Sequence, residues 1–135
     1  MTRFSDQGVT YLRERNLGRL ATAATSGKPH VAPIRFHRDP EQEVIRIGRR
    51  ILEGPARSAS TLRHLKAKPQ TALVVDDTPD AQTWQPRGIL IKGTTVLHTE
   101  GGEALGPGFS PNWVVVPDFV TPWGIEALAI RSAEG

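Results

Sequence analysis

A basic stretch between Ile47 and Lys68 holds the side chains best suited to chemistry. It reads IGRRILEGPARSASTLRHLKAK, with six Arg or Lys residues and one acid, Glu53. Clustered guanidinium groups bind phosphate, either on a nucleic acid or on a small molecule. Proteins that bind single-stranded nucleic acid interleave aromatic residues with basic ones, and this stretch has no aromatic residue. The pattern therefore disfavours a nucleic-acid face, which remains the weaker alternative.

The charges in this stretch divide into two groups. Lys66 and Lys68 end a predicted helix, where cations interact favourably with the negative pole of the helix dipole. The other group runs from a strand end, through a Gly-Pro turn, into the first turns of that helix. Backbone N–H groups, hydroxyls and guanidinium groups can converge on a phosphate there. The candidate anion-binding residues are Arg49, Arg50, Arg57, Ser58, Ser60 and Thr61. A solvated basic loop is the alternative interpretation.

A second group of candidate residues lies in the segment TWQPRGILIKG. Trp84 and Arg87 flank a Pro-containing turn that leads into the longest predicted strand. An aromatic ring beside a guanidinium group can stack on a planar ligand or on a partner chain. The alternative is a loop tryptophan that covers the core.

The sequence does not predict a metal site or a catalytic nucleophile. The chain has no cysteine, and its four histidines show no metal-ligand spacing. It also lacks the GxSxG, GxGxxG and GxxxxGK motifs. We expect neither a metal site nor catalytic residues carried by the protein itself. The histidines are His30, His37, His64 and His98.

The elements that position these residues are short strands and two helices. Ser5 is the predicted N-cap of a first helix, with Val9, Leu12 and Leu17 near one face and Gly18 at its end. Strands over about 19–24, 30–37 and 43–48 are separated by turn residues, which predicts an antiparallel meander. The second helix is predicted over 54–68.

The second half of the chain supplies the remaining strands. Residues 71–77 form a buried strand, and 87–98 form a long strand in which Ile89, Ile91 and Thr94 share one face. Gly93 indicates a bulge or bend there. Residues 113–120 and 126–132 are the last candidate strands, joined through TPWGI. The pattern predicts a mainly β fold, a small antiparallel barrel with flanking helices.

The overall composition is that of one soluble domain. The chain has 135 residues, 38% of them hydrophobic and 23% charged, with a formal net charge of +3. No apolar run approaches the roughly 20 residues that a membrane span needs. The first residues lack the apolar run of a secretory signal, so we expect a cytoplasmic protein in a single domain, residues 1–135.

An ordered set of segments resembles the pyridoxamine phosphate oxidase-like split-barrel superfamily. Within it, the chain is most similar to the class that uses the deazaflavin F420. The resemblance begins with YLRERNLGRLATAATSGKPHVAPIRFHRDP and continues through IRIGRR, LRHLKAKP and TALVVDD. It ends with WQPRGILIKG and PDFVTPWGI, and covers about Tyr11 to Glu126. No single motif is diagnostic, but the ordered set is fairly specific.

The resemblance implies a six-stranded antiparallel split β-barrel that forms a homodimer, with the cofactor in a groove at the interface. The cofactor ring would lie near Pro33, Ile34 and Gly48, and its phosphate in the segment from Arg49 to Arg63. Trp84 and Arg87 would lie beside the groove. Relatives usually carry a basic residue near Ser60 and Thr61, where this chain has hydroxyls, and Arg57 is the candidate to replace it.

The expected function is therefore an F420-dependent oxidoreductase that transfers a hydride from the reduced deazaflavin to an unsaturated small molecule. Two alternatives share the fold. One is an FMN-binding split-barrel protein, such as a flavin reductase or a pyridoxamine phosphate oxidase-like enzyme. The other is a cofactor-binding protein without turnover.

Overall fold

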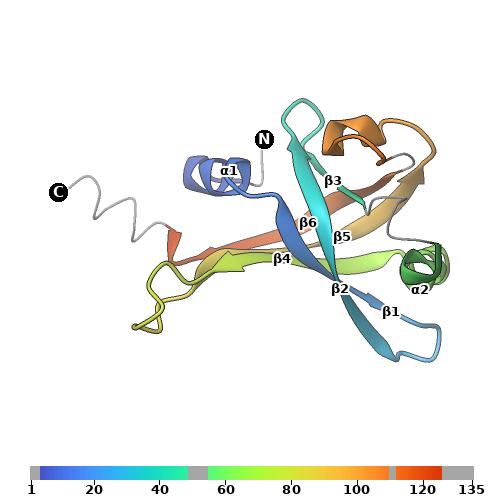
Figure 1. Ribbon diagram of the computed structural model, residues 1–135, viewed down its shortest axis with the longest axis horizontal. Coiled ribbons are helices and arrows are strands. Elements are labelled where there is room, and N and C mark those ends of the chain that lie inside the picture. Colours follow the sequence, from blue (N-terminus) through green and yellow to red (C-terminus); the bar gives the residue numbers. More distant parts are fainter. Residues whose placement is uncertain (1–3, 49–54, 110–111, 126–135) are drawn as a thin grey trace.

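Six antiparallel strands close into a barrel in the computed structural model. The structure describes residues 4–48, 55–109 and 112–125, and for residues 55–60 and 112 it describes the backbone alone. The strand order around the barrel is β1-β2-β3-β6-β5-β4, and β4 closes it by pairing with β1 (Figure 1). The strands are β1 Leu17–Ala23, β2 Pro29–Asp39, β3 Val44–Gly48, β4 Gln70–Asp77, β5 Arg87–His98 and β6 Asn112–Trp123. The predicted mainly β class and the meander of the first three strands are confirmed.

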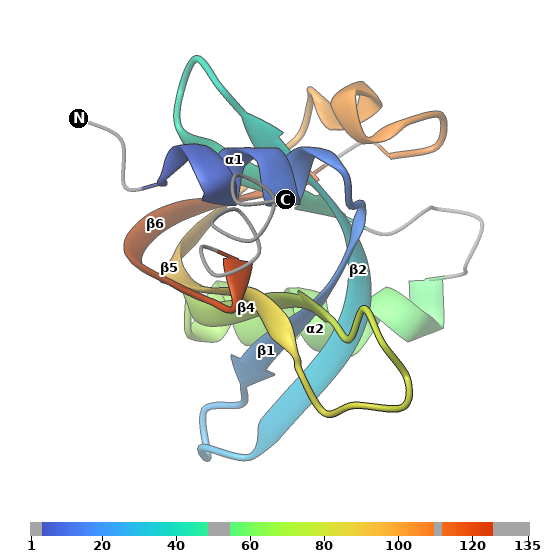
Figure 2. The same ribbon diagram turned by 90° about the vertical axis from the view of Figure 1, so that its left-hand side faces the viewer.

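Helices lie toward the two ends of the barrel. Helix α1 (Asp6–Arg13) and helix α2 (Pro55–Ala67) lie at opposite ends in Figure 1, and Figure 2 looks along the barrel with α1 nearer the viewer than α2. The predicted N-cap is confirmed, because the Gly8 N–H donates to Ser5 Oγ at 3.0 Å. A short 3-10 helix, η2 (Gly102–Leu105), follows β5.

The predicted end of the first helix was wrong. Helix α1 ends at Arg13, and Leu17 begins β1 with 55% of its surface exposed instead of joining the helix's buried face. The ladder between β1 and β2 explains the early end. Because the Asn16 carbonyl already accepts from the Phe36 N–H at 3.0 Å, the chain is extended before it reaches Leu17.

The barrel interior is filled by aliphatic side chains from alternating positions. Each strand turns one face inward, so the burial pattern has the period of two that β-structure imposes. The residues with no exposed surface include Leu20, Ile45, Ile47, Leu73, Ile89, Ile91 and Val115. The interior is therefore a packed core, and any ligand must bind to the outside or at the ends.

A β-bulge lies at Gly93, as the sequence predicted. Lys92 pairs with Phe119 and Gly93 pairs with Pro117, so Asp118 is the extra residue, on β6. Because β5 itself carries no extra residue, its alternation continues past Gly93 to Thr95. Thr95 is the buried threonine, and the assignment of Thr94 to the inner face was wrong.

The last strand is longer than predicted. Residues 121–123 continue β6, where Thr121 pairs with Leu90, instead of forming a turn. Pro117, which lacks an N–H, lies at the bulge, where the ladder is already interrupted. The predicted final strand over 126–132 lies outside the described residues.

We predict that Gly93→Ala destabilises the barrel by about 2 to 4 kcal/mol, the range of severe overpacking. A Cβ at this position would lie 2.2 Å from the Val116 carbonyl oxygen, which is backbone and cannot rotate away. Urea denaturation measures the loss. The neighbouring half-buried Thr94→Ala is the control, with an expected loss below about 1 kcal/mol. Equal losses for the two variants would show that the β5–β6 contact is not tight.

Candidate cofactor-binding site

The middle of β2 presents a flat, open outer face. Val31 and Pro33 point outward and are exposed, Val31 by 65%, while Ala32 between them points into the barrel. Their partners on β1 are Ala21 and Arg19, so no bulky aliphatic side chain stands beside them. Ile34 is only 2% exposed and belongs to the core, so only its backbone can contribute to this face.

The outer side of Gly48, at the end of β3, is covered by η2. A Cβ on Gly48 would lie 3.1 Å from Leu105 Cδ1 and 3.4 Å from Phe109 Cδ1. The Arg35 Nε–H donates to the Leu105 carbonyl and ties η2 to β2. Pro33 and Gly48, both predicted to lie near the cofactor ring, therefore differ in access: Pro33 is open and Gly48 is covered.

Sequence reasoning missed this cover. Arg35 lies on β2, and Leu105 and Phe109 lie in a Gly-rich segment for which the sequence predicted no helix or strand. The available signal was the alternation of glycines with apolar residues in GGEALGPGF, in which Gly101, Gly106 and Gly108 have positive φ. Such glycines allow a short segment to fold back onto a neighbouring surface.

The structure describes the side chains of only some of the predicted anion-binding residues. Arg57, Ser58 and Ser60 belong to its first turns, but their side chains lie outside the described part of the structure, as do Arg49 and Arg50 entirely. Thr61 is 1% exposed and faces the barrel. Arg63, two residues on, is exposed to solvent.

A cluster of two histidines and two threonines anchors α2 to the barrel. The hydroxyl oxygen of Thr61 lies 3.3 Å from His30 Nε2, and that of Thr22 lies 3.1 Å from His64 Nδ1. The two imidazole rings meet edge to face, with centroids 5.4 Å apart. Because β1, β2 and α2 each contribute, these pairs fix the helix against the β1–β2 hairpin. The spacing of His30 and His64 in the sequence did not predict that their side chains lie together.

Arg87 is engaged within its own chain. Its Nε–H and Nη2–H donate to the Asp77 carboxylate at 2.8 and 3.1 Å, in a bidentate pair. The Tyr11 hydroxyl donates to the same carboxylate at 2.6 Å, and Arg15 Nη2 lies 3.3 Å from it. This cluster joins α1 to the adjacent ends of β4 and β5. Trp84, in the loop before β5, is 85% exposed, so it does not cover the core.

The cluster stays in one charge state around neutral pH. The hydrogen bonds from Arg87, opposed by burial and aided by Tyr11 and Arg15, hold the pKa of Asp77 well below its usual range. Burial, together with the hydrogen bond to Asp77, raises the pKa of Tyr11 above its ordinary value. Asp77 is therefore anionic and Tyr11 neutral, which suits a structural clamp better than proton transfer.

Among the described residues, no group of three or more His, Cys, Asp or Glu side chains is arranged to hold a metal ion. None of the helices in the described part of the chain combines the length and apolar character that a membrane crossing requires.

A family model described as pyridoxamine 5'-phosphate oxidase matches residues 4–111. The match includes α1, the first five strands and η2. The chain belongs to the pyridoxamine 5'-phosphate oxidase family. The closed six-stranded barrel agrees with the split-barrel fold that the resemblance implied.

One curated relative in this family is a reductase. It is the 5a,11a-dehydrotetracycline/5a,11a-dehydrooxytetracycline reductase of Streptomyces rimosus, 33% identical over 124 residues, which are 91% of this chain and 84% of the relative. Together with the family match, this relationship supports an oxidoreductase activity.

Solved structures with the same fold have different functions. An F420 reductase is 20% identical, with a TM-score of 0.62 over 83% of this chain and 94% of that one. HutZ, the heme storage protein of Vibrio cholerae, is 15% identical, with a TM-score of 0.63 over 90% of this chain and 95% of that one. At such identities the likeness establishes the fold alone.

We predict that Asp77→Asn lowers the free energy of unfolding at pH 7 by about 1 to 3 kcal/mol, because it removes a half-exposed carboxylate that accepts charge-assisted hydrogen bonds. The folded pKa is depressed, so this stability is present above the unfolded pKa of roughly 4 and is lost as the pH falls below it. The difference between wild type and variant should be constant from neutral pH downward and shrink below about pH 4.

Urea denaturation at a series of pH values measures this difference. Asp76→Asn is the matched control, because in the described part of the chain Asp76 pairs with the exposed Arg19 alone, and its loss should cost below about 1 kcal/mol. A difference for Asp77→Asn that grows in acid would contradict the clamp.

Proposed function

We propose that this chain is an F420-dependent reductase that delivers a hydride to an unsaturated small molecule. The observation that carries the proposal is the 33% identity, across 91% of the chain, to a reductase of dehydrotetracyclines. The aligned region spans nearly the whole domain of this chain. The F420 reductase with the same fold supports the choice of cofactor more weakly.

The outer face of β2 suits a planar cofactor. Val31 and Pro33 leave the middle of the strand open, with the small Ala21 beside Val31. The ring would lie on this surface, contacting Pro33 and the backbone at Ile34, with Gly48 and its cover η2 at the far end. When bound, reduced F420 supplies the hydride. The chain binds and orients it and excludes water.

The basic segment is the proposed phosphate site. Arg49 and Arg50 follow β3 directly, and Arg57, Ser58 and Ser60 lie in the first turns of α2. Thr61 would act indirectly, since its buried hydroxyl meets His30 and helps to hold the helix in place. FMN also carries a phosphate and a three-ring system, so these residues alone do not separate it from F420, and FMN is retained as the alternative.

The outer face of β5 and β6 supports a homodimer. Val96, Val116 and Phe119 are 47%, 45% and 50% exposed and point outward along the two paired strands. We name them the β5–β6 apolar strip. A second copy of the chain would cover the strip. Because the strip lies across the barrel from β2, a cofactor on β2 would have to be covered by another surface. The substrate would meet the loops at 77–85 and 99–112.

Titration of the purified protein with F420 and with FMN tests the proposal. We expect saturable F420 binding, seen as a fluorescence change and as co-elution, and oxidation of reduced F420 when a dehydrotetracycline is supplied. Tight binding of FMN alone would shift the assignment to a flavoprotein. Binding of neither cofactor would overturn both readings.

Arg57→Ala should weaken the binding of the phosphate-bearing cofactor by about 1.5 to 3 kcal/mol, the value of a charge-assisted hydrogen bond. Lys66→Ala is the matched control, because it removes one charge from the other end of the same helix. Equal affinities for the two variants would place the phosphate elsewhere.

Val116→Glu should convert the dimer into a monomer without unfolding it, because the new carboxylate points outward from the barrel. Size-exclusion chromatography with light scattering gives the mass, and circular dichroism checks the fold. The control is Thr25→Glu, in the exposed turn between β1 and β2. A dimeric Val116→Glu would exclude the β5–β6 apolar strip as the interface.

A further inference from the structure

A cationic pocket lies between α1 and the end of β2, apart from the proposed cofactor face. Its volume is about 210 Å³, and four of its seven lining residues are basic. The lining residues are Val9, Leu12, Arg13, Arg15, His37, Arg38 and Pro40. None of these seven residues is acidic, although Glu43 pairs with Arg38 beside the pocket. The described lining thus combines basic and apolar side chains.

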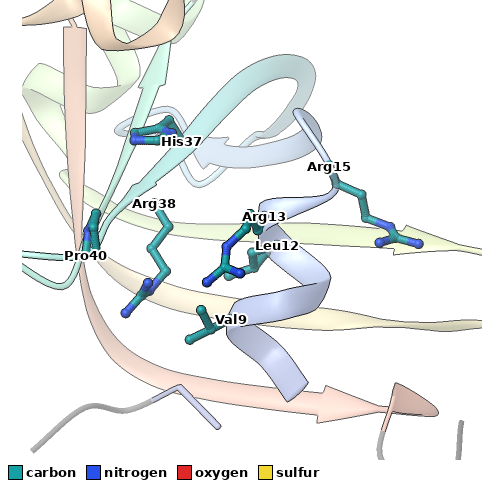
Figure 3. A pocket seen from close by; sticks show the side chains of 7 residues that line it. All are labelled: Val9, Leu12, Arg13, Arg15, His37, Arg38 and Pro40. Atoms are coloured by element: carbon teal, nitrogen blue, oxygen red, sulfur yellow. The ribbon is translucent and has the colours of Figure 1, made fainter. Parts of the chain in front are cut away.

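Two guanidinium groups converge in this pocket. Figure 3 shows the Arg13 side chain from α1 and the Arg38 side chain from β2 reaching toward the same space above Val9, whereas Arg15 points away. Arg15 is accounted for by its ion pair with Asp77 at 3.3 Å. Arg13 has no ion-pair or hydrogen-bond partner among the described residues, although its place at the end of α1 would by itself suit a cation.

Arg38 is held in place before any ligand arrives. Its Nη2–H donates to Glu43 Oε1 at 2.6 Å, and its guanidinium carbon lies 5.4 Å from the centroid of the Phe4 ring. The side chain is only 14% exposed, and its buried Nε has no hydrogen-bond partner in the described structure. The buried Nε cannot reach a ligand, but Arg38 and Arg13 together carry two positive charges and Glu43 neutralises only one of them. Such an arrangement favours a further anion.

We propose that this pocket binds a small organic oxyanion, a carboxylate or phosphate with a short apolar part. Arg13 and Arg38 would bind the charged oxygens. Val9, Leu12 and Pro40 would contact the apolar part. The volume of about 210 Å³ equals about seven water molecules, which is room for an anion and a few carbons.

The pocket is separate from the face proposed for F420. His37 lies four residues beyond Pro33 along β2, a distance of about 13 Å in an extended strand. A ligand of this size cannot span the two. The proposal therefore stands whether or not the chain binds a deazaflavin.

Backbone amide NMR on the isotopically labelled full chain tests the site, with inorganic phosphate, acetate and butyrate as probes. We expect dissociation constants on the order of 1 mM and shifts centred on Val9, Arg13, His37 and Arg38. Butyrate should bind about fivefold to tenfold tighter than acetate, because it places two more methylene groups against the apolar wall. Equal affinities of the two would overturn the assignment to an organic anion.

Arg13→Gln should weaken binding of each probe about tenfold. Because the Arg13 side chain is exposed, the variant should keep the wild-type fold. Lys28→Gln is the matched control, with the same charge change in the β1–β2 turn, and should bind as wild type does. Equal weakening in both variants, shifts scattered over the surface, or displacement of the probes by FMN or F420 would overturn the proposal.

Discussion

Closure of the barrel is the constraint on which the rest of the structure depends. The pairing of β4 with β1 and of β3 with β6 removes every free edge, and the enclosed volume is filled by aliphatic side chains with no exposed surface. The described barrel is therefore filled by its own side chains, whereas wider barrels can enclose a ligand. Binding has to use the outward faces of the strands, the barrel ends and the surfaces between neighbouring copies.

The outer face of β2 differs from the outer face of β5 and β6. On β2 the open positions are Val31 and Pro33. On β5 and β6 the β5–β6 apolar strip is about half exposed, which makes it a candidate contact surface. A planar cofactor on an open strand is exposed to solvent, so hydride transfer requires a second surface to cover it. Within the described residues, η2 covers the end of the same sheet at Gly48 but leaves the outer face at Pro33 open.

Polar clusters, and not apolar packing alone, fix the helices at the barrel ends. Asp77 collects Tyr11, Arg15 and Arg87 and so joins α1 to β4 and β5. His30 and His64 meet the two threonines and hold α2. Each cluster is satisfied by residues that are distant in sequence, and each specifies one orientation for its helix. The position of α2 matters for function, because its first turns carry the residues proposed to bind phosphate.

The sequence by itself determined the strands, the N-cap at Ser5 and the bulge at Gly93, because turn residues, capping hydroxyls and alternation act over a few neighbouring residues. It also supported the family, through an ordered set of segments. It misplaced Leu17 and Thr94, since the ladder with β2 ends the helix early and the bulge adds its residue to β6. The basic segment was found by composition, but its side chains before Thr61 lie outside the described residues.

Only the tertiary structure decided which side chains meet. The separation of 66 residues between Tyr11 and Asp77, and of 70 between Arg35 and Leu105, leaves no local pattern to detect. Arg13 and Arg38 are likewise distant in the sequence, and they line one pocket because α1 packs against the end of β2. Periodicity fixes which face a residue occupies, whereas the closure of the barrel fixes which faces come together.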